Sequence, residues 1–122
     1  QNLLAEGVLP EVQSLQELTN KIETVLARTP TVIGNPAQPI KRVAWCTGGA
    51  QGYFQEAIDA GVDAYITGEI SESQYHLANE TGVAFISAGH HATEKFGVQA
   101  LAKYIEINHG IGFQFFDEQN PA

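Results

Sequence analysis

Three short apolar segments, each followed by a turn of small residues and then by a helical pattern, constrain the fold of this chain most. The periodicity predicts three strand-then-helix pairs, with strands over 42–47, 64–67 and 83–87 and helices over 51–60, 71–79 and 92–107. Strands that are apolar on both faces and alternate with helices are typical of a parallel sheet covered on both sides. We therefore predict an α/β fold with a mostly parallel sheet and helices on both faces.

The first forty residues do not share this alternation. Residues 1–12 lack clear periodicity and are expected to form a loop or a disordered segment. A helix is predicted over 15–26, where apolar residues recur at helical spacing behind a capping-box pattern. We accordingly expect a leading helix and linker over 1–40 and an α/β domain over 41–122.

Shorter segments complete the prediction. Residues 31–33 suggest a short strand, and the turn-rich stretch 34–39 separates it from the alternating part. A last strand is predicted over 113–116. The polar tail over 117–122 is expected to be a solvated end, although it could pack on a neighbour.

The carboxyl ends of the predicted strands carry the polar residues that could support chemistry. These turns are Thr47-Gly48-Gly49, Thr67-Gly68-Glu69 and Gly89-His90-His91. In a parallel sheet all three would lie along one edge, where open α/β folds usually bind ligands. We expect a common cleft there, containing Glu69, His90 and Glu94.

His90 and Glu94 form the most specific pair of candidate ligands. In a helix that begins at His90 they lie on one face, one turn apart, and could bind one divalent metal ion. The adjacent His91 would point elsewhere, and the helix N-terminus should lower the pKa of His90 and keep it neutral. The alternative is that Glu94 is only a first-turn capping acid. Zinc takes three or four protein ligands, so further ligands would have to come from elsewhere.

Glu69 and the pair Gly48-Gly49 each admit two interpretations. Glu69 could orient a ligand histidine or act as a general base, or it could be a first-turn acid that the helix dipole favours. Gly48-Gly49 could let the backbone approach a ligand closely, or could form only a tight turn. It is neither a P-loop nor a dinucleotide fingerprint, because the lysine and the third glycine are missing.

Composition limits the partners. The formal net charge of -8 argues against nucleic acid or an anionic membrane as the main partner. No run reaches membrane-spanning length, and the single cysteine, Cys46, permits no internal disulfide and suits the cytoplasm. The chain contains no methionine and opens with Gln1, so we expect it to be part of a longer product.

Three motifs in this order resemble one known family. Residues 42–51, 61–69 and 88–94, with their Thr-Gly-Gly, Thr-Gly-Glu and Gly-His-His-x-x-Glu motifs, are similar to the bacterial GTP cyclohydrolase I type 2 homologues, also called the NIF-three-like family. The final Asn120-Pro121-Ala122 fits the bacterial branch. The resemblance covers about residues 41–122 and implies an α/β fold, a toroidal homohexamer and a site for two divalent metal ions.

The resemblance also implies which residues hold the metals. His90 and Glu94 match the histidine and glutamate of the family motif. The remaining family ligands, a histidine pair and an aspartate from the amino-terminal half, have no counterpart in this sequence. The chain therefore resembles the carboxy-terminal half of such a protein, and its missing amino-terminal half is an expected partner.

The resemblance leads to two functional hypotheses. The first is a metal-dependent hydrolase of the GTP cyclohydrolase or related nucleotide-hydrolysing type, with His90 and Glu94 as ligands and Glu69 beside the metal or in acid–base catalysis. The second is a ring-forming regulatory or interaction protein that binds metal without turnover. A plainer alternative is a generic α/β domain in which the His-His-x-x-Glu pattern is only a helix start. The metal, the substrate and the pathway are not specified by the sequence.

Overall fold

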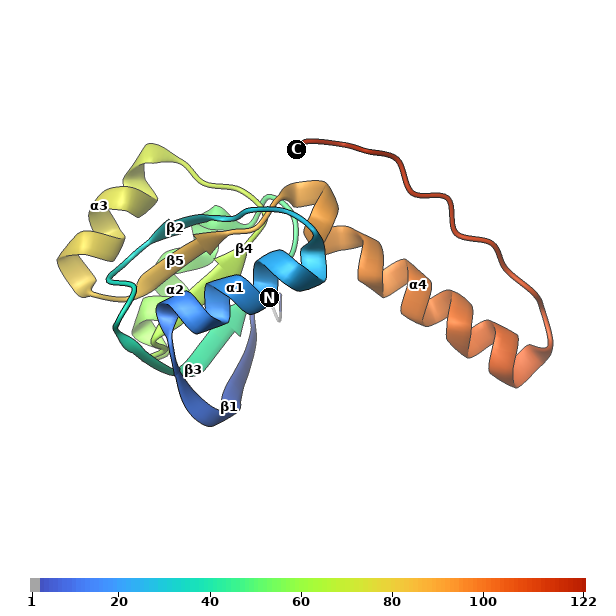
Figure 1. Cartoon of the computed structure of the whole chain (residues 1–122), viewed down its shortest axis with the longest axis horizontal. Coiled ribbons are helices and arrows are strands. Elements are labelled where there is room, and N and C mark those ends of the chain that lie inside the picture. The colour runs from blue at the N-terminus through green and yellow to red at the C-terminus, as the bar shows by residue number, and fades with distance from the viewer. Residues whose placement is uncertain (1–2) are drawn as a thin grey trace.

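A computed structural model describes residues 3–122. Their strands form one five-stranded sheet, and helices cover both of its faces (Figure 1). The strands are β1 (Ala5–Ser14), β2 (Thr31–Ile33), β3 (Pro39–Trp45), β4 (Ala64–Thr67) and β5 (Ala84–Ser87). The helices are α1 (Leu15–Leu26), α2 (Phe54–Asp59), α3 (Glu72–Thr81) and α4 (His90–His109), with a 3-10 turn, η1 (Gln51–Tyr53), before α2.

The strand order β1-β3-β4-β5-β2 confirms the predicted mostly parallel sheet. β3, β4 and β5 pair in parallel at the centre, whereas β1 and β2 pair antiparallel at the two edges. Parallel neighbours need crossover connections, and α2 and α3 supply them. The carboxyl ends of the three central strands therefore meet at one edge of the sheet, as predicted.

Each sheet face has its own apolar core, because successive strand residues point to opposite faces. Leu15 and Leu18 of α1 cover the face that carries Val43, Ala64 and Ile86. On the other face, α2 and α3 pack over a second buried set, which consists of Ala44, Phe54, Ala57, Val62, Tyr65, Ala78 and Phe85. The sheet edge that carries the candidate residues is thus supported from both sides.

The expectation of a loop or disorder over residues 1–12 is wrong from Ala5 onward, because Ala5–Ser14 form the edge strand β1, while residues 1–2 lie outside the described part of the chain. Its pairing with β3 breaks between Val8 and Gln13, where Pro10 cannot donate a main-chain hydrogen bond. This proline and the irregular register explain why β1 lacks a readable alternation. The segment 1–40 thus contributes β1, β2 and the start of β3 to the same sheet that the later strands form, and its helix α1 covers one face of that sheet.

α4 begins at His90, two residues before the predicted start, and extends to His109. Figure 1 shows it leaving the sheet as a projecting arm, with the following segment running back beside it. The predicted strand over 113–116 is wrong: these residues have no regular secondary structure and are exposed. A strand needs a neighbour for its backbone groups, and α4 carries this segment away from the sheet edges.

Candidate metal site at the strand ends

The three turns at the carboxyl edge of the sheet are joined directly by main-chain hydrogen bonds. The Gly68 N–H donates to the Gly48 carbonyl at 2.9 Å, and the Gly89 N–H donates to the Gly68 carbonyl at 3.0 Å. The Ser87 hydroxyl also donates to the Gly68 carbonyl, at 3.0 Å. The turns after β3, β4 and β5 therefore form one continuous platform, on which the first turn of α4 lies.

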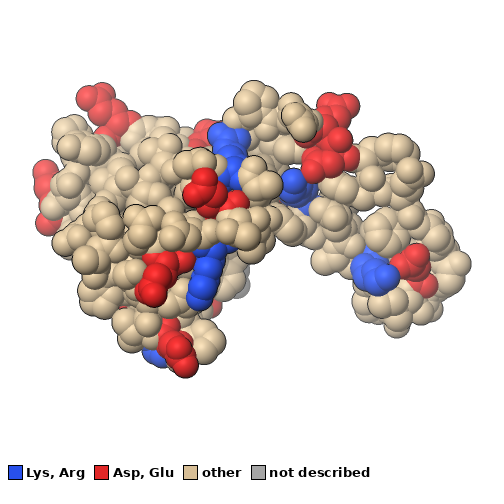
Figure 2. Space-filling model, viewed as in Figure 1, with Lys and Arg blue, Asp and Glu red and all other residues tan. Residues whose placement is uncertain are grey.

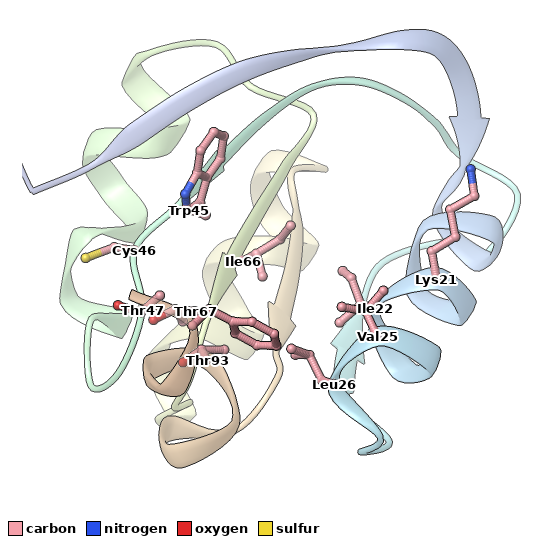
Figure 3. A pocket seen from close by; sticks show the side chains of 11 residues that line it. Lys21, Ile22, Val25, Leu26, Trp45, Cys46, Thr47, Ile66, Thr67 and Thr93 are labelled. Atoms are coloured by element: carbon pink, nitrogen blue, oxygen red, sulfur yellow. The ribbon is translucent and has the colours of Figure 1, made fainter. Parts of the chain in front are cut away.

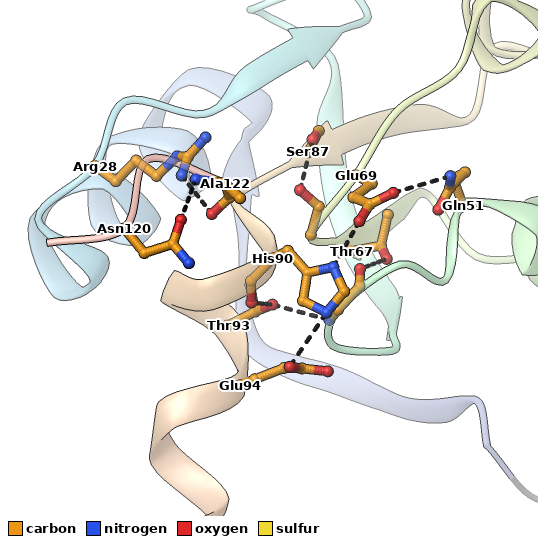
Figure 4. Close-up of polar contacts among 12 residues, drawn as sticks. Arg28, Gln51, Thr67, Glu69, Ser87, His90, Thr93, Glu94, Asn120 and Ala122 are labelled. Carbon is orange, nitrogen blue, oxygen red and sulfur yellow. Dashed lines mark hydrogen bonds and ion pairs between the residues drawn. The ribbon is translucent and has the colours of Figure 1, made fainter. Parts of the chain in front are cut away.

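His90 lies on this platform between two carboxylates (Figure 4). Its Nδ1 is 2.5 Å from Glu69 Oε1, and its Nε2 is 3.2 Å from Glu94 Oε2. Glu69 comes from the turn after β4, whereas Glu94 is one helical turn beyond His90. The Gln51 side-chain amide donates to the other oxygen of Glu69 at 3.3 Å. His90 thus contacts both of the other residues that were expected in a common cleft.

The contact between His90 and Glu94 is suited to a cation. When Nδ1 donates its proton to Glu69, the Nε2 of a neutral imidazole presents a lone pair, and this lone pair faces a carboxylate oxygen 3.2 Å away. Two electron-rich atoms at that distance require a proton or a metal ion between them. Donors that each lie about 2.0–2.2 Å from one ion are themselves roughly 3 Å apart, so the pair fits two ligands of one metal.

Glu69 also has the geometry of a residue that orients a metal ligand. Histidines that bind metal through one ring nitrogen usually donate the other N–H to a carboxylate, which fixes the tautomer and the ring orientation. The Glu69 contact to Nδ1 has this form and leaves Nε2 directed toward Glu94. The arrangement favours the orienting interpretation of Glu69 over the simple first-turn acid.

The expectation of a lowered His90 pKa is wrong for this structure. Hydrogen bonding to Glu69 raises the pKa of His90, and the charge of Glu94 raises it further. Reciprocally, the bond from His90 lowers the pKa of the Glu69 carboxyl, with the Gln51 amide adding to the effect. Two nearby carboxylates outweigh the helix N-terminus, because opposite charges in contact favour the protonated imidazole.

His91 points to the other side of α4, as expected for adjacent residues. Its Nε2 lies 2.9 Å from Asp117 Oδ1, and Lys95 Nζ lies 2.9 Å from Asp117 Oδ2. The Arg28 guanidinium and the His91 N–H both donate to the Ala122 carbonyl, at 2.8 Å and 3.1 Å. The tail, which was expected to be a solvated end, is therefore exposed but tethered to the first turn of α4.

Two glycines of the platform lie very close to the side chains of the candidate site, and the positive φ of Gly48 favours glycine there. A Cβ on Gly48, whose φ is +71°, would collide with the Glu94 carboxylate and lie 3.1 Å from His90 Nε2. A Cβ on Gly49 would lie 3.2 Å from Glu69 Oε1. The close approach inferred for Gly48-Gly49 is therefore made to the side chains of the candidate site.

The sequence analysis missed two residues that hold the candidate site together. Thr93 accepts a hydrogen bond from the Gly48 N–H, and Gln51 holds Glu69. Gln51 follows the glycine turn directly, and Thr93 lies between the two candidate ligands on the predicted helix. Their positions were the available signal, but neither residue type has a specific spacing rule for such contacts.

An apolar pocket of about 330 Å³ adjoins the site between α1, the sheet and the start of α4 (Figure 3). Its apolar walls are formed by Ile22, Val25, Leu26, Trp45, Ile66 and Phe96. Thr67 and Thr93 line the pocket as well. These two threonines also bond to Gly48, so the pocket and the candidate site share a boundary.

Two ligands do not complete a metal site. Within residues 3–122, no group of three or more His, Cys, Asp or Glu side chains is placed to hold one ion. As candidate ligands, His90 and Glu94 would therefore need further donors from elsewhere. Nor does any helix in this described part have the length and hydrophobicity needed to cross a membrane.

Comparisons with known proteins cover nearly the complete chain. The chain is 64% identical over 122 residues to a "GTP cyclohydrolase 1 type 2 homolog" of Neisseria meningitidis serogroup B, and 50% identical over 116 residues to one of Pseudomonas aeruginosa. These matches cover 100% and 95% of the chain but only 49% and 46% of the relatives. The chain thus spans about half the length of the curated relatives it matches.

Solved structures share the fold. The protein ybgI, described as of unknown function, superposes with a TM-score of 0.93 at 43% identity, over 100% of this chain and 50% of that one. TTHA1606 of Thermus thermophilus gives a TM-score of 0.81 at 28% identity, over 92% of this chain and 45% of that one. The sequence model of Duf34/NIF3 (NGG1p interacting factor 3) matches residues 1–121, and the chain belongs to this family.

Proposed function

We propose that this chain is the metal-binding carboxy-terminal half of a metal-dependent hydrolase related to the GTP cyclohydrolase 1 type 2 homologues. His90 and Glu94 are its metal ligands, and Glu69 orients His90. The observation that carries the proposal is the 3.2 Å separation between His90 Nε2 and Glu94 Oε2, with Nδ1 occupied by Glu69. The chain's half-length match to its relatives supports an amino-terminal half that supplies the remaining ligands of a site for two divalent ions.

The residues present would each have a distinct part in hydrolysis. Glu69 holds the imidazole by its Nδ1–H, so that the Nε2 lone pair is directed toward the metal position. A divalent ion bound there supplies Lewis acidity to the bond that is hydrolysed. Acid–base catalysis is the alternative role of Glu69, whose carboxylate is exposed beside His90.

The substrate class proposed is a nucleotide, after the name of the relatives. The charge distribution disfavours a polymeric nucleic acid as partner. On the face shown in Figure 2, Lys and Arg occur singly among acidic and uncharged residues, and the formal net charge of the chain is -8. An anionic substrate would be attracted by the metal ions themselves, because a bound divalent cation dominates its local field.

A second candidate function is a metal-binding regulatory or interaction protein without turnover. The observation that favours it is the apolar surface of α4, where Leu101, Tyr104 and Ile107 are all more than half exposed. Exposed apolar patches commonly mark interaction sites. A homohexameric ring in the cytoplasm is the assembly and location proposed for either function.

Metal content and turnover of the full-length protein test both functions. Elemental analysis of the wild type, His90→Ala and Glu94→Gln would be combined with an assay on GTP and other nucleotides. His76→Ala is a matched control, since His76 is exposed on α3. We expect about two equivalents of metal in the wild type and control, reduced metal in the site variants, and metal-dependent turnover that is lost with His90.

The other outcomes are equally informative. Metal binding that depends on His90, without turnover on any nucleotide, would favour the interaction protein. Equal metal content in the wild type and both site variants would refute the ligand assignment itself.

A further inference from the structure

Thr93 links the helix that carries the candidate ligands to the loop beneath them. Its hydroxyl accepts a hydrogen bond from the Gly48 N–H at 3.0 Å and donates one to the His90 carbonyl at 3.0 Å. The residue is half-buried on α4, between His90 and Glu94 (Figure 4). One hydroxyl therefore joins α4 to a residue 45 positions earlier in the chain.

The loop that Thr93 contacts is itself firmly held. The Gly48 carbonyl accepts hydrogen bonds from the Gly68 N–H at 2.9 Å and from the buried Thr67 hydroxyl at 3.2 Å. Two residues later, the Ala50 carbonyl accepts a bond from the buried Tyr65 hydroxyl at 2.7 Å. Hydrogen bonds from β4 thus hold the loop in place, and the Thr93 hydrogen bond holds α4 against the loop.

The position of Gly48 matters directly to the ligand pair. A methyl group at its Cα would collide with the Glu94 carboxylate and approach His90 Nε2 to 3.1 Å. The distance between α4 and this loop therefore decides where both ligand side chains can lie. A small displacement of the first turn of α4 would change the separation between Nε2 and the carboxylate, which is now 3.2 Å.

The hydroxyl contacts of two other helical threonines stay within or next to their own helices. Thr24 and Thr81 donate to carbonyls four residues earlier in their own helices, at 2.8 Å and 2.7 Å. Such bonds are local and are available to any helical threonine. The Thr93 hydroxyl also receives a main-chain donor from another element, so its role extends beyond its own helix.

We propose that Thr93 is a positioning residue, which holds His90 and Glu94 at the separation needed to bind one divalent ion without touching that ion itself. This inference rests on the proposed metal-binding function. Residues that hold metal ligands in place through hydrogen bonds contribute about 10–100-fold to metal affinity.

The test uses the full-length protein with Thr93→Val, Thr93→Ser and the matched control Thr24→Val. Valine keeps the shape of threonine and removes the hydroxyl, whereas serine retains the hydroxyl. Titration of metal-free protein with Co²⁺ is expected to show about 10–100-fold weaker binding for Thr93→Val, near-normal binding for Thr93→Ser and no change for Thr24→Val. Unaltered Co²⁺ affinity in Thr93→Val, even with a lower melting temperature, would overturn the proposal.

A metal-free measurement separates this inference from the proposed function. Hydrogen exchange of the Gly48 amide should be about tenfold or more faster in Thr93→Val than in the wild type or Thr93→Ser, because its acceptor is gone. If the wild type binds no Co²⁺, the metal-binding function fails, but the exchange rates still decide whether Thr93 holds the loop. Equal Gly48 exchange in all variants would refute the link.

Discussion

The strand-end site and the distal arm are adjoining parts of the chain with opposite construction. The strand-end site comprises residues 47–51, 67–69 and 87–94, and hydrogen bonds join each of these three segments to another. The distal arm, residues 97–116, has no buried residue and exposes large apolar side chains along its length. Both regions include part of α4, so helix formation alone does not explain the difference between them.

The difference shows what the chain can complete by itself. The strand-end site is organised by hydrogen bonds among segments that the sheet already brings together. The arm has an apolar surface and a helical sequence, but residues 3–122 provide nothing that covers it. Burial needs a second surface, and the sequence of the arm cannot supply one.

The largest expected contrast compares apolar side chains in the sheet core and the arm. Phe54 is fully buried, with its ring centroid 4.9 Å from that of Phe85, whereas Leu101 is 59% exposed. We expect Phe54→Ala to reduce the free energy of unfolding by about 3–5 kcal/mol, and Leu101→Ala to change it by about 0.5 kcal/mol or less. Urea denaturation of this chain measures both, and comparable losses would show that the arm is packed in solution.

Glycine substitutions give a smaller contrast. A Cβ on Gly68 would lie 2.6 Å from the Gly48 carbonyl oxygen and 2.7 Å from the His90 Cα, both of which are main-chain atoms. Gly68→Ala should therefore destabilise the chain by about 1–3 kcal/mol and displace α4. Gly97→Ala is the control, because nothing lies within 4 Å and alanine favours a helix interior by roughly 0.5–1 kcal/mol. Thermal unfolding should shift in opposite directions for the two variants.

These contrasts also explain how far the sequence could be interpreted. The central strands were predictable because short apolar segments with glycine turns have few alternatives, and the spacing of His90 and Glu94 indicated their pairing. The strand β1 was not predictable from the sequence, because Pro10 and the irregular pairing with β3 remove its alternation of apolar and polar residues. The apolar alternation over 113–116 predicted a strand, but pairing depends on a neighbouring edge that no local pattern reveals.

The next effect concerns protonation at the strand-end site. The pKa of His90 is raised by Glu69, so this contact stabilises the fold below the ordinary pKa of histidine and is lost as pH rises through the raised value. The pKa of Glu69 is lowered, so its contribution is present above the ordinary glutamate value and is lost as pH falls. The interaction should be strongest between about pH 4.5 and 6.5.

NMR titration of the metal-free chain tests this interaction. Glu69→Gln should lower the pKa of His90, and the difference in unfolding free energy from the wild type should be greatest within that pH interval. Glu80→Gln, at an exposed position on α3, is the matched control and should leave the titration of His90 unchanged. An unaltered His90 titration in Glu69→Gln would place the dominant charge elsewhere.

The smallest expected effect concerns the tether between the tail and α4. Asp117 contacts His91 and Lys95, each at 2.9 Å, and the pKa of its carboxyl is lowered mainly by Lys95. The three side chains are partly exposed, at 23–42%, and solvent weakens such ion pairs, so Asp117→Asn should hardly alter the unfolding transition. It should instead release the tail, which chymotrypsin would cleave faster after the exposed Phe116.

Glu118→Gln removes the neighbouring charge and is the control. High salt should accelerate cleavage of the wild type toward the rate of Asp117→Asn, because salt screens exposed ion pairs. Equal cleavage of both variants and the wild type would mean that the Arg28 and His91 bonds to Ala122 hold the tail without Asp117.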